Sequence, residues 1–245
     1  MPTSDLTLLH LDDDLVAVDK PSGLLVHPSQ LDAHAGLTAL DLLQSRLGQR
    51  LWPLHRLDKG TSGVLLMARH VEAARFWGEA FQASRVGKRY RALVRGWPPA
   101  EGRIDQPLAR DPERPSAGQP TREAVTDFRS LARFDWPFQV DARHPTSRYA
   151  LVEAWPLTGR RHQIRRHFKH IAHPLVGDST HGKGAHNRAV AAWLGQARLW
   201  LHACEVILPR AGDAGDLRIV SPCGPGWPGA ADAPSDPPPI LRGLR

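Results

Sequence analysis

One acidic side chain, Asp58, stands between two basic ones in a glycine-rich segment of the sequence. Arg56 and Lys59 flank it within the run 55–63 (HRLDKGTSG), and the apolar run 64–67 (VLLM) follows. Positive neighbours favour the ionised form of a carboxyl group, and a turn held by a buried strand often carries catalytic side chains. An isolated short motif of this kind is more often an ordinary turn. Asp58 is therefore a candidate nucleophile that needs a second motif in its support.

The second motif is the basic segment 159–170 (GRRHQIRRHFKH). We expect a helix here, in which residues four apart share a face. The residues that would share faces are Arg161, Arg165 and Lys169, and separately His162 and Arg166. Like charges stacked in this way repel, which favours an anionic partner, either nucleic acid or a buried carboxylate such as Asp58. A solvated basic face explains this stretch equally well when it is taken alone.

Two other patterns resemble ligand sites without meeting their requirements. Histidines cluster at positions 162, 167, 170 and 173, but the cluster contains no acidic residue to act as the general base of a zinc helix. Residues 177–184 (GDSTHGKG) have the glycine and lysine spacing of a P-loop, but Gly184 stands where a hydroxyl should bind magnesium. The sequence therefore predicts no metal, and a loop at 177–184 that is a candidate for substrate contact.

The composition indicates a globular protein with a polyanionic partner. Lys and Arg total 32 against 25 Asp and Glu, giving a formal net charge of +7 and a pI near 10.1. This balance suits phosphate contacts, although a modest excess also serves general solubility. Two cysteines, Cys204 and Cys223, support neither a disulfide framework nor a cysteine-based zinc site, so we expect a reducing, cytoplasmic setting. We expect neither secretion nor membrane insertion, because no stretch approaches the roughly 18 apolar residues of a span.

Hydrophobic periodicity predicts a mixture of strands and helices. Strands are expected at 6–9, 15–18, 64–68, 88–94, 124–131, 149–154 and 199–208, with another fed by the turn at 22–27. Helices are expected at 37–47, where Thr38 could cap the N-terminus, and at 71–83 and 160–171. The pattern has more strand than helix and no regular alternation of parallel units. It predicts an α+β fold, with a mixed, largely antiparallel β-sheet core and flanking helices.

The same pattern predicts a simple domain organisation. Residues 98–122 are rich in proline, glycine and charge, and we expect a long surface connection with at most short strands. A single catalytic domain is expected over residues 1–222, without an N-terminal S4 RNA-binding domain. The segment 223–245 is rich in proline and glycine, and we expect a flexible tail.

Three motifs, taken in order, resemble the signatures of the RluA family of pseudouridine synthases. They are 55–63, 88–90 (KRY) and 160–165 (RRHQIR), and 20–27 (KPSGLLVH) is similar to the family's opening segment. The likeness runs from about residue 12 to about residue 221. Residues 165–182 look most like the branch that modifies uridine 65 of tRNA. One departure is Arg161, which occupies a position often filled by threonine in the wider family and bears on which RNA is read.

The resemblance implies a pseudouridine synthase fold and an isomerase that flips a uridine out of tRNA and converts it to pseudouridine without a cofactor. It gives Asp58 the catalytic role and Arg165 the role of its partner. Tyr90 would stack on the uracil, although a packed strand aromatic is the commoner explanation for a lone tyrosine. Arg56 would occupy the space that the flipped base leaves. The other candidate RNA contacts are His55, Lys59, Lys88, Arg89, Arg161, His162, Arg166 and Lys169.

The resemblance also implies a monomer that needs no protein partner and acts on RNA away from membranes. Two alternatives stay open. The substrate could be a ribosomal RNA, or the chain could be a catalytically silent protein that binds or remodels RNA. The second alternative is disfavoured by Asp58, Tyr90 and Arg165, because a pure binder has no use for a nucleophile.

Overall fold

The computed structural model describes residues 6–28, 36–112, 114–115, 117–209 and 215–229 of the 245-residue chain. The chain divides into two compact units, each made of two segments. The first unit contains residues 1–88 and 202–222, and the second contains residues 89–201 and 223–245. Each unit has its own hydrophobic core.

The first unit is built on a sheet with the strand order β1, β2, β4, β11. Its strands are β1 (Thr7–Leu11), β2 (Leu15–Lys20), β3 (Trp52–Pro53), β4 (Ser62–Ala68), β11 (Leu201–Leu208) and β12 (Leu217–Val220). β3 pairs with β4, and β12 pairs with β11. All of these pairs are antiparallel except β4 with β11, which are parallel over a short register. β4 is buried along its whole length, as the apolar run after Asp58 predicts.

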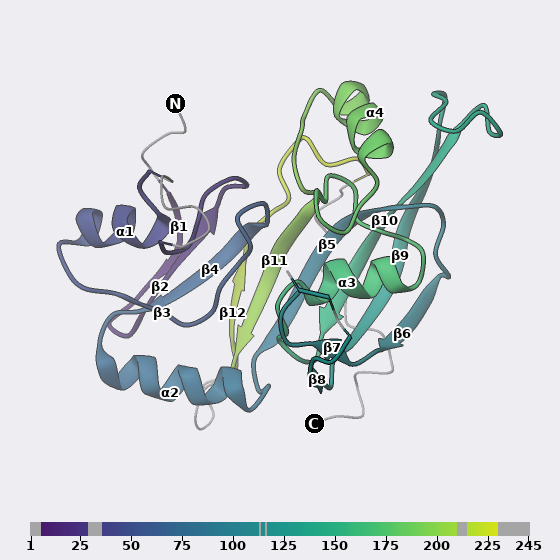
Figure 1. Cartoon of the computed structure of the whole chain (residues 1–245). Helices are drawn as coiled ribbons and strands as arrows, with labels where there is room; N and C mark the ends of the chain where they lie inside the picture. The colour runs from purple at the N-terminus through teal and green to yellow at the C-terminus, as the bar shows by residue number, and fades with distance from the viewer. Residues whose placement is uncertain (1–5, 29–35, 113, 116, 210–214, 230–245) are drawn as a thin grey trace. The chain divides into compact units, whose positions relative to one another are not determined.

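Two helices belong to the first unit, α1 (Ala39–Leu47) and α2 (Val71–Gln82). α1 starts at a capping box, in which the Thr38 side chain accepts from the Asp41 backbone N–H and the Asp41 side chain accepts from the Thr38 N–H. α2 packs on β3 and β4 (Figure 1). Its buried residues Ala73, Trp77 and Ala80 recur at helical spacing and join the core of this unit.

The second unit is built on an antiparallel sheet with the order β5, β10, β9, β6. Its strands are β5 (Gly87–Arg95), β6 (Glu101–Asp105), β9 (Val125–Trp136) and β10 (Ser147–Pro156), and β7 (Leu108–Ala109) pairs separately with β8 (Thr121–Arg122). Helix α3 (Gln163–His170) packs on β9 and β10, across one face of the sheet (Figure 1). Phe168 of α3 meets Phe128 of β9 edge to face, with ring centroids 5.4 Å apart. A loop then leads from α3 into α4 (Gly184–Leu194).

The fold class predicted from the sequence is confirmed, with local differences. The strand expected after the turn at 22–27 falls mostly on residues 29–35, which lie outside the described residues. Within the turn itself, the Leu25 and Val26 carbonyls accept from the Ala39 and Leu40 N–H groups at the start of α1. α3 begins three residues later than expected, because His162 has a left-handed backbone with φ 55°. β3, α4 and β12 were not predicted. The long connection at 98–122 holds the short strands β6, β7 and β8, as expected.

The segment expected to be a tail is described as far as residue 229. Within it, Trp227 is buried and packs edge to face on Trp200, with ring centroids 5.3 Å apart. The rest of the expected tail lies outside the described residues, and the single-domain boundary at 222 stays a prediction. No helix among the described residues is long and apolar enough to cross a membrane.

Candidate active site

Asp58 lies in a tight turn immediately before the buried strand β4. Its carbonyl accepts the Thr61 N–H at 3.0 Å, which closes the turn. Gly63 has φ +107°, and a Cβ at this position would lie 2.2 Å from the Ala203 carbonyl oxygen of β11. Only glycine fits both the backbone conformation and the close approach. The glycine of the motif therefore lets β4 pair with β11 just after the residue predicted to be catalytic.

A buried lysine fixes the other side of the Asp58 turn. Lys20 is fully buried, and its Nζ donates to the carbonyls of Pro21 at 2.8 Å, Leu24 at 2.8 Å and Lys59 at 3.3 Å. Three acceptors match the three donors of an ammonium group, which makes its burial tolerable. The neighbouring Gly23 N–H also donates to the Lys59 carbonyl, at 2.8 Å. Two hydrogen bonds from the segment 20–24 therefore hold the carbonyl of Lys59, the residue next to Asp58.

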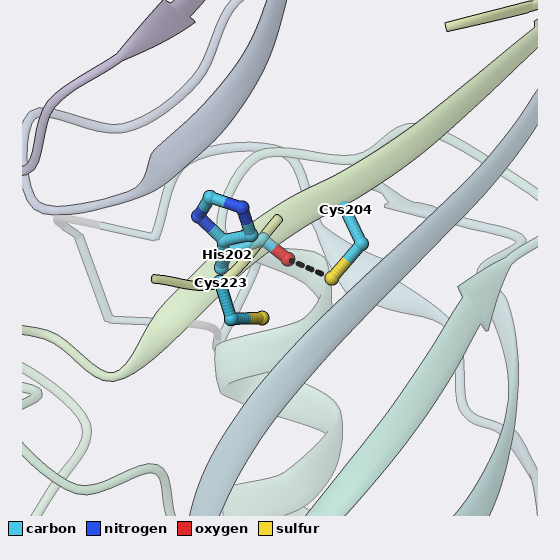
Figure 2. A group of neighbouring side chains, drawn as sticks. All are labelled: His202, Cys204 and Cys223. Atoms are coloured by element: carbon cyan, nitrogen blue, oxygen red, sulfur yellow. Dashed lines mark hydrogen bonds between the residues drawn. The ribbon is translucent and has the colours of Figure 1, made fainter. Parts of the chain in front are cut away.

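His202 fixes the start of β4 from within the same unit. Its Nδ1 lies 2.8 Å from the Ser62 hydroxyl, and its Nε2 lies 3.1 Å from the Ser221 carbonyl oxygen. Both ring nitrogens thus take part in hydrogen bonds. Figure 2 shows His202 with Cys204 on the same strand, where the Cys204 thiol donates to the His202 carbonyl at 3.6 Å. Cys204 and Cys223 are both buried, and no disulfide joins them.

The other predicted residues of the first unit differ in exposure. Arg56 and Lys59 are exposed, as residues that contact RNA should be, and Lys88 is half-buried. His55 instead stacks on Phe81 with centroids 5.2 Å apart, and its Nε2 accepts the Leu66 N–H at 3.1 Å. Burial lowers the pKa of His55 to about 3, with a further contribution from the charge of Lys88. A neutral imidazole bonded to the backbone orders the turn and offers no charge to RNA.

Tyr90 and Arg89 lie next to each other on β5 and have different surroundings. Tyr90 is half-buried beside the core of the second unit. Arg89 is buried, and its Nη1 lies 2.5 Å from Oε1 of Glu153, which is also buried. Removing one member of such a pair typically costs about 3–5 kcal/mol. Arg91 shares the same carboxylate, with its Nε 3.4 Å from Oε1. The burial of Arg89 and its ion pair argue against a phosphate contact, and that role stays a prediction.

Arg165 points one edge of its guanidinium at Asp178. Its Nε donates to Oδ2 at 2.7 Å and its Nη2 donates to Oδ1 at 2.9 Å, and both residues are buried. Burial alone would raise the pKa of Asp178, but the hydrogen bonds and charge of Arg165, with two backbone N–H groups, lower it below its usual value. The pair is thus ionised at neutral pH. No sequence motif marked Asp178 as the partner of Arg165; it lies in the run that resembles a P-loop.

The rest of the basic segment is not one exposed face. Arg161 is half-buried with Nη1 3.9 Å from Oδ1 of Asp111, and Arg166 is half-buried and donates to the Ala109 carbonyl at 2.9 Å. Burial lowers the pKa of Arg166. His162 is held by a contact of 3.2 Å between its Nδ1 and Nε2 of His181. Lys169 is exposed.

The predicted catalytic residues are distributed over both units. Asp58 belongs to the first unit, and Tyr90 and Arg165 belong to the second. Among the described contacts, Arg165 donates to Asp178, which the sequence did not indicate. The pairing of Arg165 with Asp58 stays a prediction. The sequence analysis missed three supporting residues, Lys20, His202 and Asp178. The first two act through contacts with segments that are distant in the chain, and Asp178 lies in a loop whose structure the sequence pattern does not predict.

An α+β fold on a largely antiparallel sheet is the fold expected of the enzymes that isomerise uridine in RNA. Residues 14–170 match the family model described as RNA pseudouridylate synthase, and the chain belongs to this family.

Relatives support the same family. One named tRNA pseudouridine synthase C, from Pasteurella multocida (strain Pm70), is 43% identical over 213 residues, covering 82% of this chain and 85% of the relative. A relative of the same name from Haemophilus ducreyi is 41% identical over 203 residues, covering 81% and 83% of the two chains. The solved structure titled Human RNA Pseudouridylate Synthase Domain Containing 1 has a TM-score of 0.70 at 26% identity, covering 91% of this chain and 86% of that chain.

Proposed function

We propose that the protein is a tRNA pseudouridine synthase and that its target is uridine 65. The observation that carries the proposal is the similarity over most of both chains to relatives named tRNA pseudouridine synthase C, such as the 43% identity with the Pasteurella multocida protein. The motif around Asp58 lies inside the matched region 14–170. The position of the uridine rests on the resemblance of residues 165–182 to one branch of the family.

The proposed reaction is an isomerisation without redox change. The bond between uracil N1 and ribose C1′ breaks, the base turns over, and a bond forms between C5 and C1′. The proton on C5 is lost and N1 gains a proton, so atoms and electrons balance without a cofactor. Asp58 is the proposed catalytic residue, acting either as a nucleophile or in deprotonation at the ribose. Each route requires an ionised carboxylate.

The other roles follow from the chemistry of the side chains. Arg165 is the proposed partner of the Asp58 carboxylate, and Tyr90 is the proposed stacking surface for the uracil. A uridine in a stem must leave its stack before it can react, at a cost of about a few kcal/mol. Arg56 is exposed and next but one to Asp58 in the sequence, which suits it to fill the vacated space.

The proposed partner is RNA alone, bound by a monomer in the cytoplasm. The net charge of +7 supports a polyanionic substrate. Exposed cations such as Lys59 and Lys169 are the best candidates for phosphate contacts, because their side chains lie at the surface, where a phosphate can approach.

Release of tritium from tRNA labelled at uridine C5 tests the proposal, because the C5 proton leaves only if the new bond forms. We expect release by the wild type and loss of release for Asp58→Ala. Asp13→Ala is the control, since it removes an exposed carboxylate from the same unit. Tritium release by Asp58→Ala at the wild-type rate would end the catalytic interpretation of that residue.

The same assay separates the alternatives. A tRNA with cytidine in place of uridine 65 should release no tritium, and continued release would move the target to another position. Release from ribosomal RNA but not from tRNA would assign the enzyme to ribosomal RNA. Tight RNA binding without release from either RNA would support a silent RNA-binding protein.

A further inference from the structure

We propose that Asp178 is a positioning residue for catalysis, which holds the guanidinium of Arg165 in its working orientation. The inference rests on the proposed function and deepens it, since it adds a residue that neither the sequence motifs nor the comparisons assign to the site.

The first observation is the completeness of the contacts around the Asp178 carboxylate. Oδ2 accepts from Arg165 Nε at 2.7 Å, and Oδ1 accepts from Arg165 Nη2 at 2.9 Å, from the Thr180 N–H at 2.9 Å and from the His181 N–H at 2.8 Å. A carboxylate has about four lone-pair sites, and four donors reach this one, three of them at Oδ1. Asp178 is therefore held by contacts inside the protein, which points to a role through Arg165.

The second observation is the division of the Arg165 donors. A guanidinium carries five N–H groups in a fixed plane, and Asp178 takes two of them on one edge. Two parallel hydrogen bonds fix the plane as well as the position of the group. The donors on the remaining nitrogen, Nη1, thereby acquire a defined direction, which a single hydrogen bond would not impose.

The third observation is that the loop carrying Asp178 is itself held rigidly. Asn187 of α4 clamps it on both sides, since its Oδ1 accepts the Gly177 N–H at 2.9 Å and its Nδ2 donates to the Asp178 carbonyl at 2.9 Å. Two glycines make the loop possible. A Cβ on Gly177 would lie 1.7 Å from the Arg198 carbonyl oxygen, and one on Gly182 would lie 2.3 Å from the Asp178 carbonyl oxygen. A rigid loop is what a positioning residue requires, because its own freedom would pass to Arg165.

The fourth observation connects the same loop to a second predicted site residue. His181, whose backbone N–H binds Asp178, also contacts His162 through a distance of 3.2 Å between Nε2 and Nδ1. Burial lowers the pKa of His181, which keeps its ring neutral near pH 7. The loop therefore orders both Arg165 and His162, the residues at the start of α3.

The test is a double-mutant cycle between Asp178→Asn and Arg165→Lys, measured as the single-turnover rate of tritium release at saturating enzyme. This rate does not depend on the active fraction, so partial unfolding does not lower it. Asp178→Asn should slow release about 100-fold, as expected for a misplaced catalytic group. The dissociation constant for tRNA should change by less than about threefold, because no phosphate contact is removed.

The interaction in the cycle separates positioning from general support. Lysine cannot form two parallel hydrogen bonds, so Arg165→Lys already loses the orientation that Asp178 provides. In the Arg165→Lys background, Asp178→Asn should therefore cost less than about threefold more. An equal fold loss in both backgrounds, or an Asp178→Asn rate within about threefold of wild type, would overturn the proposal.

The chain offers a matched control in Asp127. Arg103 donates to it through Nε at 2.7 Å and through Nη2 at 2.9 Å, and the Asp127 side chain is fully buried in the same unit. Asp127→Asn thus breaks a pair of the same geometry outside the proposed site. It should leave the single-turnover rate within about threefold of wild type in both backgrounds.

Two further results keep the proposal testable. If Asp178→Asn does not fold, Asn187→Ala replaces it in the cycle, because this change removes the side-chain contacts that hold the loop and keeps the Arg165–Asp178 ion pair. Asn187→Ala should slow tritium release about tenfold when residue 165 is arginine, and should have no such effect when it is lysine. A rate equal to wild type for Asn187→Ala would then overturn the proposal. The wild-type protein must release tritium in the same experiment, so failure of the proposed function is recognised separately.

Discussion

The hydroxyl of Ser62 and Nδ1 of His202 lie 2.8 Å apart inside the first unit. Ser62 follows Asp58 by four residues in the sequence. The bond joins β4 to β11 at the point where the two parallel strands pair. Because His202 also contacts the Ser221 carbonyl, one imidazole orders three segments around the Asp58 turn.

His202→Leu should lower the free energy of unfolding by about 2 kcal/mol, because it deprives buried polar groups of this partner. Part of the loss should return in the double variant His202→Leu with Ser62→Ala, which removes the Ser62 hydroxyl as well. Urea denaturation of the single and double variants measures both effects. A double variant less stable than His202→Leu would show that the Ser62 hydroxyl does not depend on His202.

Gly63→Ala should be much more destabilising than an ordinary glycine substitution, at about 3 kcal/mol or more, because positive φ and a clash combine. The new Cβ would lie 2.2 Å from the Ala203 carbonyl oxygen, and that backbone atom cannot move without disturbing β11. The control is Gly48→Ala, which also has positive φ, +64°, but has nothing within 4 Å. Gly48→Ala should cost only about 1 kcal/mol.

Urea denaturation midpoints of the two glycine variants give the comparison. Tritium release should fall more in Gly63→Ala than in Gly48→Ala, since only the first adjoins the Asp58 turn. Equal stability losses would mean that the approach of β4 to β11 is not as restrictive as the distance indicates.

The sequence predicted those features whose signals are local. Thr38 and the apolar spacing after it predicted α1, and the structure places a capping box there. α4 was missed because only Val190 is buried in it, so it has no apolar stripe to detect. The short-range charge pattern around Asp58 likewise marked a candidate catalytic turn.

The supporting contacts could not be predicted, because they join residues that are distant in sequence or buried against expectation. Lys20 reads as a surface lysine, and its burial depends on carbonyls that only the folded turn brings to it. Arg89 appeared equivalent to its basic neighbour Lys88 until β10 supplied Glu153. The Arg165–Asp178 pair depends on the loop that returns from α3, which periodicity does not describe.

Two cations of the second unit should respond differently in RNA binding. Lys169→Gln should reduce the slope of log affinity against log salt by about 0.7–1, as expected when one phosphate contact is lost. Its stability should stay within about 0.5 kcal/mol of wild type, because Lys169 is exposed.

Arg89→Gln should show the opposite pattern. It should leave the salt slope unchanged and lower the free energy of unfolding by about 3 kcal/mol, because Glu153 loses its nearest partner in the interior. tRNA titrations at several salt concentrations, together with urea denaturation, measure both quantities. A reduced salt slope in Arg89→Gln would instead identify Arg89 as an RNA contact.

His167 should make the protein less stable in mild acid. Its ring is fully buried between the Thr126 hydroxyl at 2.9 Å and the Gln106 carbonyl at 3.1 Å, and burial lowers its pKa to about 4. In the unfolded chain the pKa is about 6.5, so the unfolded state binds the proton more readily. The contribution of the neutral ring is fully present above about pH 6.5 and is lost progressively as the pH falls towards about 4.

The variant His167→Gln lacks the titrating ring, so it should lose less stability than wild type between about pH 7.5 and about pH 5. The control is His170→Gln, which removes an exposed histidine from the same helix. Urea denaturation at the two pH values measures the effect, and an equal loss of stability in wild type and His167→Gln would show that the buried ring does not resist protonation.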